Sequence, residues 1–278
     1  MQLRYILVII SIITIQQVAA QPMASYILSP QPEISRGSLF KHIAETSEVL
    51  IKGVKTPPTK VEKRFNINGF IVSSVTLNSA GGKTCETIWE YASDKCLIRK
   101  FHRSFVNLRG WSEEEVQITW DENYTLPSKI EVFKNGKLWQ WAILLADSLK
   151  KIESARVISS TGAHIFTERF VYIEASNMIK VMVYRANGAF TGTSSFPLDQ
   201  NKPFVFESVS RKYYPNGDIM IETLADASKG DQAYYYEYEY DTQGNWITKN
   251  TYQVKLGKND RISNKKIENR VTRVITYL

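Results

Sequence analysis

The sequence has few of the residues that form metal, cofactor or disulfide sites. Its 278 residues include two cysteines and three histidines, and no Cys-x-x-Cys or His-x-x-x-His spacing occurs. The histidines, His42, His102 and His164, lie about 60 residues apart. Two cysteines are also too few to stabilise a small scaffold through disulfides. We therefore expect neither a metal ion nor a cofactor.

Motifs of known catalytic machinery are absent as well. There is no Gly-x-Ser-x-Gly, no phosphate-binding loop and no dinucleotide-binding glycine triplet. Two stretches begin like calcium loops, at Asp121 and Asp226, but they have Leu126 and Asp231 where such a loop requires glycine. On a strand, the carboxylates of the acidic run Glu113–Glu115 would point to alternate faces, which does not suit a catalytic pair. We expect these residues to form a solvated turn. The sequence therefore predicts a protein without enzymatic activity.

The sequence also lacks long segments with helical periodicity. Aromatic residues, which favour strands, make up 12% of the chain, with 15 tyrosines and 6 tryptophans. The hydrophobic content of 43% is ordinary for a globular protein. Because no helices are available to cover a sheet, we expect an all-β fold in which the sheet curves on itself.

The N-terminus has the order of a secretory signal peptide. Met1–Arg4 carries one positive charge, Tyr5–Ile15 is an uncharged apolar run, and Val18-Ala19-Ala20 supplies small residues for cleavage. The apolar run is shorter than the roughly 20 residues that a membrane-spanning helix needs. We expect cleavage after Ala20 and an exported protein that is periplasmic, on the cell surface or secreted.

The chain is basic, but its basic residues are scattered. The formal charge of +7 becomes +6 once Arg4 leaves with the signal peptide. A basic protein can bind anionic glycans or nucleic acid, yet Lys and Arg are spread along the whole sequence. Export and scattered charge together predict no nucleic-acid partner. An envelope glycan or an envelope protein is the candidate partner, and the oligomeric state is open.

We expect both cysteines to be free. Glu86–Tyr91 and Leu97–Phe101 have the composition of two hairpin arms. In such a hairpin Cys85 would lie opposite His102, about 20 Å from Cys96 at ~3.3 Å per residue. A disulfide tolerates a Cα separation of only roughly 7 Å.

Residues 21–60 differ from the rest of the chain. Prolines interrupt both ends of this segment, as in Pro30, Pro32 and Thr56-Pro57-Pro58-Thr59. Between them, Ser38–Lys52 fits either a short helix or a strand through Val49-Leu50-Ile51. We expect residues 21–60 to be a leader or tether and residues 61–278 to form one repeat β-sheet domain.

From residue 61 onward, glycines in turn-like contexts recur at regular spacing. They fall at 82, 110, 136, 162, 188, 217 and 244, at intervals of 26 to 29 residues. Two strands, one tight turn and one return loop account for this interval, and a fixed period of roughly 20–50 residues is typical of repeat architectures. We predict an antiparallel meander of consecutive β-hairpins that forms one long curved sheet.

Three of these glycines follow asparagine. Asn-Gly is the pair that best tolerates the positive φ angles needed at both central positions of a type I′ turn. We therefore expect mirror-type turns at these positions. The predicted turn residues are Asn135, Gly136, Asn187, Gly188, Asn216, Gly217, Gly244 and Asn245.

Aromatic residues form two ladders with the period of a strand. Four tyrosines alternate with Glu237 and Glu239 along one segment. Leu138–Leu145 contains two tryptophans and is apolar on both faces, so we expect a central strand that is covered on both sides. Such ladders either pack against neighbouring strands or stack on sugar rings and clamp peptides. The candidate ligand-binding residues are Tyr234, Tyr236, Tyr238, Tyr240, Trp246, Trp139 and Trp141.

Two segments resemble known repeats. Tyr238–Trp246, with Lys249 and Tyr252 behind it, resembles the tyrosine–aspartate (YD, or RHS-type) repeat of exported proteins from Bacteroidetes-like bacteria. Lys212–Ile219 is similar to a MORN-variant repeat, another short hairpin module. Both resemblances imply hairpins laid side by side in a long curved sheet, and neither implies a reaction or catalytic residues. Only one unit carries the Tyr-Asp…Gly-Asn core, so the resemblance does not extend to a closed RHS shell.

Three functions are consistent with these features. The first is a non-catalytic exported repeat protein whose sheet presents a surface to a glycan, a peptide or another envelope protein. The second is a small outer-membrane β-barrel, because a hairpin period of about 27 residues and abundant aromatic residues also suit one; against it, the last segment, Val271–Leu278, lacks clean alternation. The third is a hydrolase with no recognisable motif.

Overall fold

The structure is a computed structural model that describes residues 22–28, 35–51, 54–92, 97–123, 125–199, 209–224, 232–257 and 261–278. The expected signal peptide, Cys96 and the loop at Asp226 lie outside these residues. The described chain contains 18 strands, one short helix, α2 (Ser25–Leu28), and one 3-10 turn, η1 (Glu174–Ser176). The prediction of an all-β fold is confirmed.

The strands follow one another closely along the chain. They are β1 (Phe40–Ile51), β2 (Val54–Lys55), β3 (Thr59–Phe65), β4 (Ile71–Leu77), β5 (Lys83–Tyr91), β6 (Ile98–Asn107), β7 (Gly110–Trp120), β8 (Pro127–Lys134), β9 (Lys137–Ala146), β10 (Ile152–Ser159), β11 (His164–Ile173), β12 (Met178–Arg185), β13 (Phe190–Pro197), β14 (Val209–Tyr213), β15 (Ile219–Leu224), β16 (Gln232–Tyr240), β17 (Trp246–Leu256) and β18 (Ile262–Tyr277).

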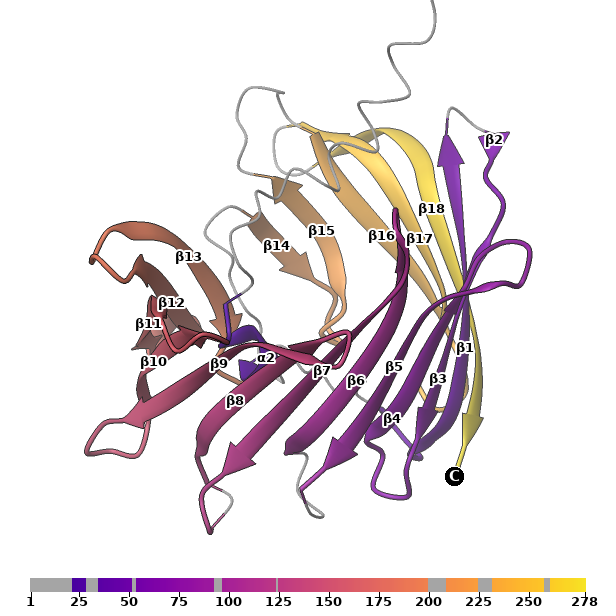
Figure 1. The fold of residues 1–278 in the computed structure, drawn as a ribbon. Coiled ribbons are helices and arrows are strands. Elements are labelled where there is room, and N and C mark those ends of the chain that lie inside the picture. The colour runs from indigo at the N-terminus through magenta and orange to yellow at the C-terminus, as the bar shows by residue number, and fades with distance from the viewer. Residues whose placement is uncertain are drawn as a thin grey trace, which may run out of the picture.

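The strands form an antiparallel meander in one open, curved sheet (Figure 1). Each strand from β3 to β12 pairs with the next one, and so does each strand from β14 to β17. Strand β1 joins the two runs, because it pairs with β18 along one edge and with β2 and β3 along the other. The first and the last strand of the described residues therefore lie side by side. The predicted meander and its curvature are confirmed.

Strand β1 resolves the two alternatives left open for Ser38–Lys52. Phe40–Ile51 is a strand, and it begins well before the predicted Val49-Leu50-Ile51. Its inward side chains pack with the sheet: Phe40 and Ile43 are buried in a small cluster with Phe65. This part of the expected leader is thus a strand of the sheet itself.

Turn glycines at one end of the sheet account for the period of 26 to 29 residues. Positive φ angles occur at Gly81, Gly110, Gly136, Gly162, Gly188, Gly217 and Gly244; Gly110 is the first residue of β7, and each of the others lies between consecutive strands. The first differs from the expectation, because Gly81 and not Gly82 has the left-handed conformation (φ 82°). Each period consists of two strands, as predicted.

Most of these turns are not mirror-type turns. Both central φ angles are positive at Asn135-Gly136, at 49° and 74°, but at Asn187-Gly188 and Asn216-Gly217 only the glycine is left-handed. In the turn that contains Gly188, its N–H donates to the Arg185 carbonyl at 2.8 Å, and the Arg185 N–H donates to the Ala189 carbonyl at 2.8 Å. This pattern is a type I turn that ends in a glycine bulge. The expectation of mirror-type turns at the last two Asn-Gly pairs is therefore wrong.

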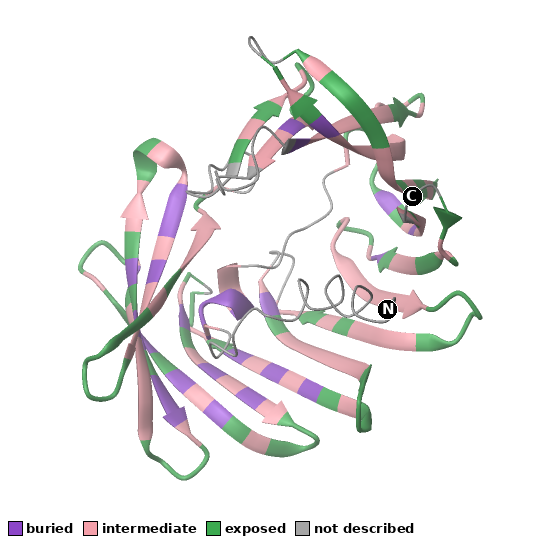
Figure 2. Cartoon of the chain, turned by 90° about the horizontal axis from the view of Figure 1, so that it is seen from above, coloured by how far each residue is buried: buried purple, intermediate pink, exposed green. Residues whose placement is uncertain are grey.

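The two faces of the sheet can be followed through the strand registers. Tyr238 lies opposite Lys249, Lys249 opposite Val271, and Val271 opposite Ser47. The same face continues from β1 to β11 through Ile43, Lys63, Ser74, Thr87, Arg103, Glu114, Val116, Val132, Gln140, Ala142, Val157, Ala155 and Glu168. Helix α2 packs against this face, inside the curve of the sheet (Figure 2). We call it the inner face and the opposite one the outer face.

The main core lies on the inner face of β6–β12, beneath the residues that precede β1. Met23 and Ala24 are 1% and 0% exposed, and Tyr26 packs against Phe101 with ring centroids 5.6 Å apart. The sheet side of this core consists largely of Val116, Ile130, Val132, Ala142, Ala155, Val157 and Val181. Helix α2 is too short to span a membrane, and no other helix of the described residues is long and apolar enough to do so.

Strand β9 corrects the prediction for Leu138–Leu145. It lies between β8 and β10, and its inner residues Gln140, Ala142 and Leu144 are buried. Its outer residues are not covered, since Ile143 is 40% and Leu145 54% exposed. The strand is therefore covered on one face and not on both.

Strands β5 and β6 form the hairpin expected around the cysteines, in a different register. Cys85 lies opposite Phe105, whereas His102 lies opposite Ile88. Cys85 is a free thiol. The pairing state of Cys96 stays a prediction because that residue is outside the described residues.

Candidate functional site

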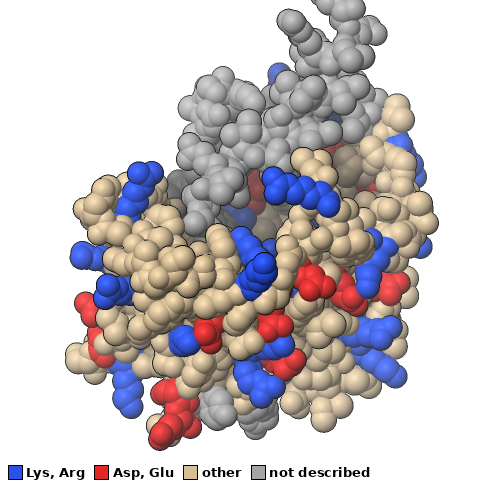
Figure 3. All heavy atoms as spheres, viewed as in Figure 1, with Lys and Arg blue, Asp and Glu red and all other residues tan. Residues whose placement is uncertain are grey.

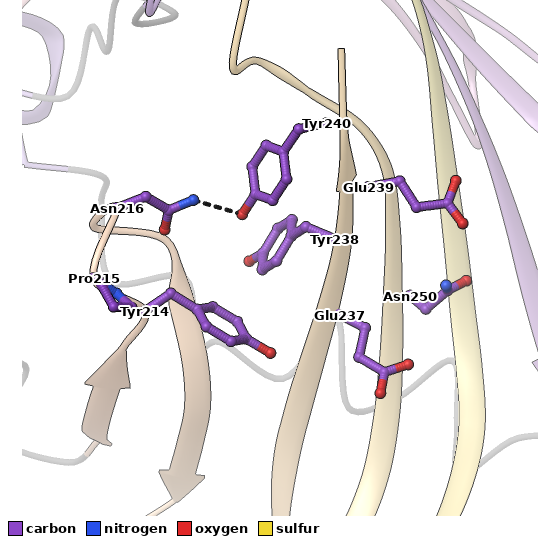
Figure 4. Close-up of a pocket in the computed structure, with 8 residues that line it drawn as sticks. All are labelled: Tyr214, Pro215, Asn216, Glu237, Tyr238, Glu239, Tyr240 and Asn250. Carbon is purple, nitrogen blue, oxygen red and sulfur yellow. Dashed lines mark hydrogen bonds between the residues drawn. The ribbon is translucent and has the colours of Figure 1, made fainter. Parts of the chain in front are cut away.

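A cavity of about 560 Å³ opens beside β16, where this strand diverges from β15. The pairing of the two strands ends at Ile221–Tyr235, but β16 continues to Tyr240. The turn between β14 and β15 occupies part of the space that opens (Figure 4). The residues that line the cavity are Tyr214, Pro215, Asn216, Glu237, Tyr238, Glu239, Tyr240 and Asn250. We call it the tyrosine pocket.

The lining residues of β16 separate into two groups. Figure 4 shows the rings of Tyr238 and Tyr240 directed toward the β14–β15 turn, while Glu237 and Glu239 point to the other side of the strand. This is the alternation that the sequence predicts. Glu237 forms an ion pair with Lys265, which lowers the pKa of Glu237 from its ordinary range. The aromatic side of the pocket therefore belongs to the inner face, and the carboxylates belong to the outer face.

Tyr238 is at the centre of the aromatic contacts. Its ring centroid lies 6.1 Å from that of Tyr214, with an interplanar angle of 85°, and 6.0 Å from that of Tyr240, with an angle of 29°. Trp246 lies 6.4 Å away on its other side. Edge-to-face and offset contacts of this kind are attractive beyond the area they bury. The rings thus form a defined apolar wall.

Hydrogen bonds fix two of the three tyrosines. The Tyr214 hydroxyl donates to the carbonyl of Tyr236 at 2.8 Å, and so satisfies a backbone acceptor beyond the point where β15 pairing ends. The Tyr240 hydroxyl donates to Asp218 at 2.7 Å and accepts from Asn216 at 2.8 Å. The Tyr238 hydroxyl makes no hydrogen bond to any described residue. Among the described residues, only the Tyr214 and Tyr240 hydroxyls are thus engaged in the wall.

The tyrosines of the pocket are neutral at physiological pH. Burial is the largest cause of the raised pKa of Tyr238, and nearby acidic and phenolic groups add to it. Burial likewise raises the pKa of Tyr236 to about 12. A neutral phenol donates one hydrogen bond and accepts others, so these tyrosines can bond the polar groups of a ligand without adding charge to the pocket.

The two predicted aromatic ladders do not form one surface. Tyr238 and Tyr240 line the pocket, and Tyr234 and Tyr236 continue the same inner face along β16. Trp141 lies on the outer face of β9, where the ammonium group of Lys129 stands 5.4 Å from its ring centroid. Trp139 lies at the register shift between β8 and β9, and the ammonium group 3.1 Å from its ring centroid is that of Lys134, which lies opposite the inner-face residue Glu114. The tryptophans of β9 are therefore no part of this site.

Other parts of the pocket were not predicted as ligand contacts. Asn216 was expected only as a turn residue, and Tyr214 and Asp218 were not singled out. Tyr214 immediately precedes the Pro-Asn-Gly turn, which was a signal for a side chain held at the end of a hairpin. Nothing local in the sequence indicates that this turn leans toward β16.

Acidic residues do not gather into a second site in the described part of the chain. No three His, Cys, Asp or Glu side chains come together there in a way that would hold a metal ion. Within the run Glu113–Glu115, Glu114 pairs on the inner face with Arg103 at 3.0 Å, and Glu115 pairs on the outer face with Lys100 at 2.9 Å. Neighbouring carboxylates thus point to opposite faces, as the alternation predicts. The expectation of a solvated turn is wrong, because Glu113–Glu115 lie in strand β7 and Glu114 is 7% exposed.

Comparison with known proteins identifies no family. No family model and no curated protein matches the sequence. Solved structures with some likeness include a porin-like protein from Bacteroides uniformis, 12% identical over 88% of this chain and 100% of that one, with a TM-score of 0.34. A Photorhabdus luminescens Tc holotoxin pore is 11% identical over 83% of this chain, with a TM-score of 0.34, and a TcdB2–TccC3 complex is 12% identical over 81%, with a TM-score of 0.33. The match covers 16% and 15% of those two toxin chains.

Proposed function

We propose that this protein is a non-catalytic, exported binding protein whose tyrosine pocket holds a glycan. The observation that carries the proposal is the pocket itself, where three tyrosine rings from two separate hairpins meet around about 560 Å³ of space. A volume of this size lies within the range of small-ligand sites, roughly 300–1,000 Å³. It suits one or two sugar rings.

The chemistry of the lining favours a sugar over a charged ligand. A pyranose ring presents C–H groups on its faces, which pack on aromatic rings such as those of Tyr238 and Tyr240. Its hydroxyls need partners that both donate and accept, and the Tyr238 hydroxyl and the Asn216 amide offer both. Of the charged residues beside the pocket on the inner face, Asp218 and Arg36 are paired with each other at 2.8 Å, and the ammonium group of Lys249 lies 5.4 Å from the centroid of the Trp246 ring. Asp218 and Arg36 therefore offer no free charge to an ionic ligand.

The outer face supports a protein surrounded by water. On the outer face, charged pairs lie in the middle of the strands, such as Lys100 with Glu115 and Lys129 with Glu131. Figure 3 shows basic and acidic side chains interspersed over the visible face. A lipid-facing strand would carry apolar side chains at these positions, because a charge at mid-membrane costs roughly 2–4 kcal/mol. Washing membranes with sodium carbonate is expected to release the protein, and retention with the lipid would contradict the proposal.

The resemblance to the YD-type repeat is part of this proposal. In the turn after β16, Asp241 Oδ1 accepts the N–H groups of Gln243 and Asn245 at 2.9 Å each, and Gly244 has a φ of 80°. The aspartate and glycine of the Tyr-Asp…Gly-Asn core thus have a structural role, which is to close a hairpin. We propose that Tyr238–Trp246 is one YD-type hairpin that also supplies the binding tyrosines.

The test is binding of the purified mature chain, residues 21–278, to a panel of envelope glycans. A glycan that binds is then titrated against Tyr238→Ala, Tyr238→Phe and Tyr236→Ala. We expect Tyr238→Ala to weaken binding at least about tenfold, because stacking and a hydrogen bond are both lost, and Tyr238→Phe to lose less.

The matched control is Tyr184→Ala. Tyr184 is a half-buried tyrosine on the outer face of β12, with Arg169 5.4 Å from its ring centroid, so its removal is expected to leave the affinity unchanged. Absence of binding to every glycan, or equal affinity of Tyr238→Ala and the wild type, would refute the proposal.

A further inference from the structure

The tyrosine pocket adjoins a part of the chain that precedes the first strand. Residues 35–38 cross the turns that follow β14 and β16. The Arg36 N–H donates to Asn245 Oδ1 at 2.9 Å, and the Ser38 N–H donates to Gln243 Oε1 at 2.6 Å. A Cβ atom at Gly37 would lie 2.4 Å from Gln243 Oε1. Backbone bonds and close packing therefore hold this segment in place and fix where the Arg36 side chain begins.

The Arg36 side chain continues the contact into the wall of the pocket. Its guanidinium donates to both oxygens of Asp218, at 2.9 Å and 2.8 Å. The same carboxylate accepts the Tyr240 hydroxyl. The Arg36 guanidinium carbon also lies 5.9 Å from the centroid of the Tyr240 ring. Arg36 thus acts on Tyr240 through Asp218 and through the ring face.

This arrangement sets the position of one pocket wall. A bidentate pair of guanidinium and carboxylate restricts the carboxylate in angle as well as in distance. The Asp218 side chain is only 15% exposed, so loss of the arginine would leave a largely buried charge without its counter-charge. We expect Asp218 then to turn toward water and to release the hydroxyl of Tyr240, whose ring stacks on Tyr238.

Residues 22–28, closer to the N-terminus, are also held against the sheet. Met23 and Ala24 donate their N–H groups to the carboxylate of Glu168 on β11, at 2.6 Å and 2.9 Å. Their side chains are buried against the inner face of the sheet. The segment therefore contacts β11 through residues 22–28 and the two pocket turns through residues 35–38.

We infer that residues 22–28 and 35–38 together form a strap, anchored on the inner side of the sheet at β11 and at the two pocket turns, and that Arg36 is a positioning residue of the tyrosine pocket. The strap is a property of the fold. The effect of Arg36 on ligand affinity rests on the proposed function.

The experiment is hydrogen–deuterium exchange, read by mass spectrometry, on the full chain and its Arg36→Ala, Arg36→Lys and Arg185→Ala variants. The reporters are peptides that contain the turns 214–218 and 241–245. Their N–H groups at Gly217 and Gly244 bond to the carbonyls of Tyr214 and Asp241. Thermal unfolding of each variant first establishes that it is folded.

We expect Arg36→Ala to speed exchange in both turns by about tenfold, since local opening becomes easier when a tethering contact is removed. Arg36→Lys is expected to be intermediate, because lysine keeps the charge but not the two-pronged geometry. Arg185 is the matched control: it is an exposed arginine at the β12–β13 turn, and Arg185→Ala is expected to leave both pocket turns unchanged. Equal exchange in Arg36→Ala and the wild type would overturn the inference.

Ligand binding is measured separately, so that a result against the glycan proposal can be told apart from a result against the strap. If a glycan binds the wild type, we expect Arg36→Ala and Tyr240→Phe each to weaken it, with partial rescue in Arg36→Lys. Faster exchange without any change in affinity would support the strap and overturn the positioning role. If no glycan binds, the exchange result still decides on the strap.

Discussion

Glu168 accepts the backbone N–H of Met23 at 2.6 Å across 145 residues of sequence. Glu168 is 2% exposed, and its carboxylate also accepts the N–H of Ala24. It is therefore the one side chain that satisfies two adjacent buried backbone donors at the start of the N-terminal segment. Several consequences of this arrangement can be measured.

The first prediction concerns stability. Glu168→Ala leaves two buried N–H groups without an acceptor and opens a small cavity, so we expect the free energy of unfolding to fall by roughly 2–4 kcal/mol. Urea unfolding followed by tryptophan fluorescence measures it. The control is Glu153→Ala, which removes an exposed carboxylate from the neighbouring strand β10 and is expected to change stability by less than ~0.5 kcal/mol. Equal effects of the two substitutions would show that the N-terminal segment is not held by Glu168.

The second prediction concerns pH. Burial raises the pKa of Glu168 from 4.5 to about 7, while the N–H bonds from Ala24 and Met23 oppose the rise. The folded protein thus holds this proton more tightly than the unfolded chain does. The stabilising contribution of protonated Glu168 is fully present below pH ~4.5 and is lost as the pH rises through about 7, a change on the order of 3 kcal/mol.

Comparison of the wild type with Glu168→Gln isolates this contribution. Other carboxyl groups work in the opposite direction at lower pH: the pKa values of Glu115 and Asp241 are lowered, despite some burial, by hydrogen bonds from Gln117 and Tyr277. Both proteins share those groups, so they cancel in the difference. Between pH 4.5 and 8 we expect the stability of the wild type to decrease relative to that of Glu168→Gln. A pH-independent difference would contradict the burial of an ionisable group at this position.

The third prediction separates backbone conformation from packing at the turns. Gly136 has a φ of 74°, Gly192 has no positive φ, and a Cβ atom at either position would meet nothing within 4 Å. Gly136→Ala is expected to destabilise the protein by roughly 1–2 kcal/mol, because an L-residue is strained in the left-handed region. Gly192→Ala, on strand β13, is expected to be neutral or slightly stabilising. Thermal unfolding of the pair gives the answer, and an equal loss in both variants would argue against the turn geometry.

These turns also show what the sequence could predict. Glycine spacing, strand-like runs and alternation are local signals, and they were sufficient for the meander, for its two-strand period and for the shared face of Tyr238 and Tyr240. The type of turn was less accessible. Asn-Gly permits a mirror-type turn, but Asn187 and Asn216 instead occupy the third position of a four-residue turn in which glycine alone is left-handed.

Contacts between residues that are far apart in the sequence could not be predicted from local sequence patterns. The pairing of β1 with β18 joins Glu45 to Arg273, far apart in sequence, and no pattern within either strand specifies its partner. The pocket depends on the same kind of contact, because Arg36 reaches Asp218 across 182 residues. Periodicity shows that side chains share a face, but it does not tell which face is concave or which turn leans over it.

The last prediction tests which face of β9 is covered, the point at which the sequence was most misleading. Leu144 and Leu145 are neighbours on one strand; Leu145 is 54% exposed on the outer face and Leu144 is 8% exposed on the inner face. Leu144→Ala removes part of the core and is expected to cost about 2–4 kcal/mol. Leu145→Ala removes the same atoms from a surface that faces water, so we expect a cost below ~1 kcal/mol. Since the two side chains are identical, size alone would give equal costs. If Leu145→Ala costs as much as Leu144→Ala in urea unfolding, a second layer must cover the outer face, and the outer face of β9 would again be a candidate for a partner-binding surface.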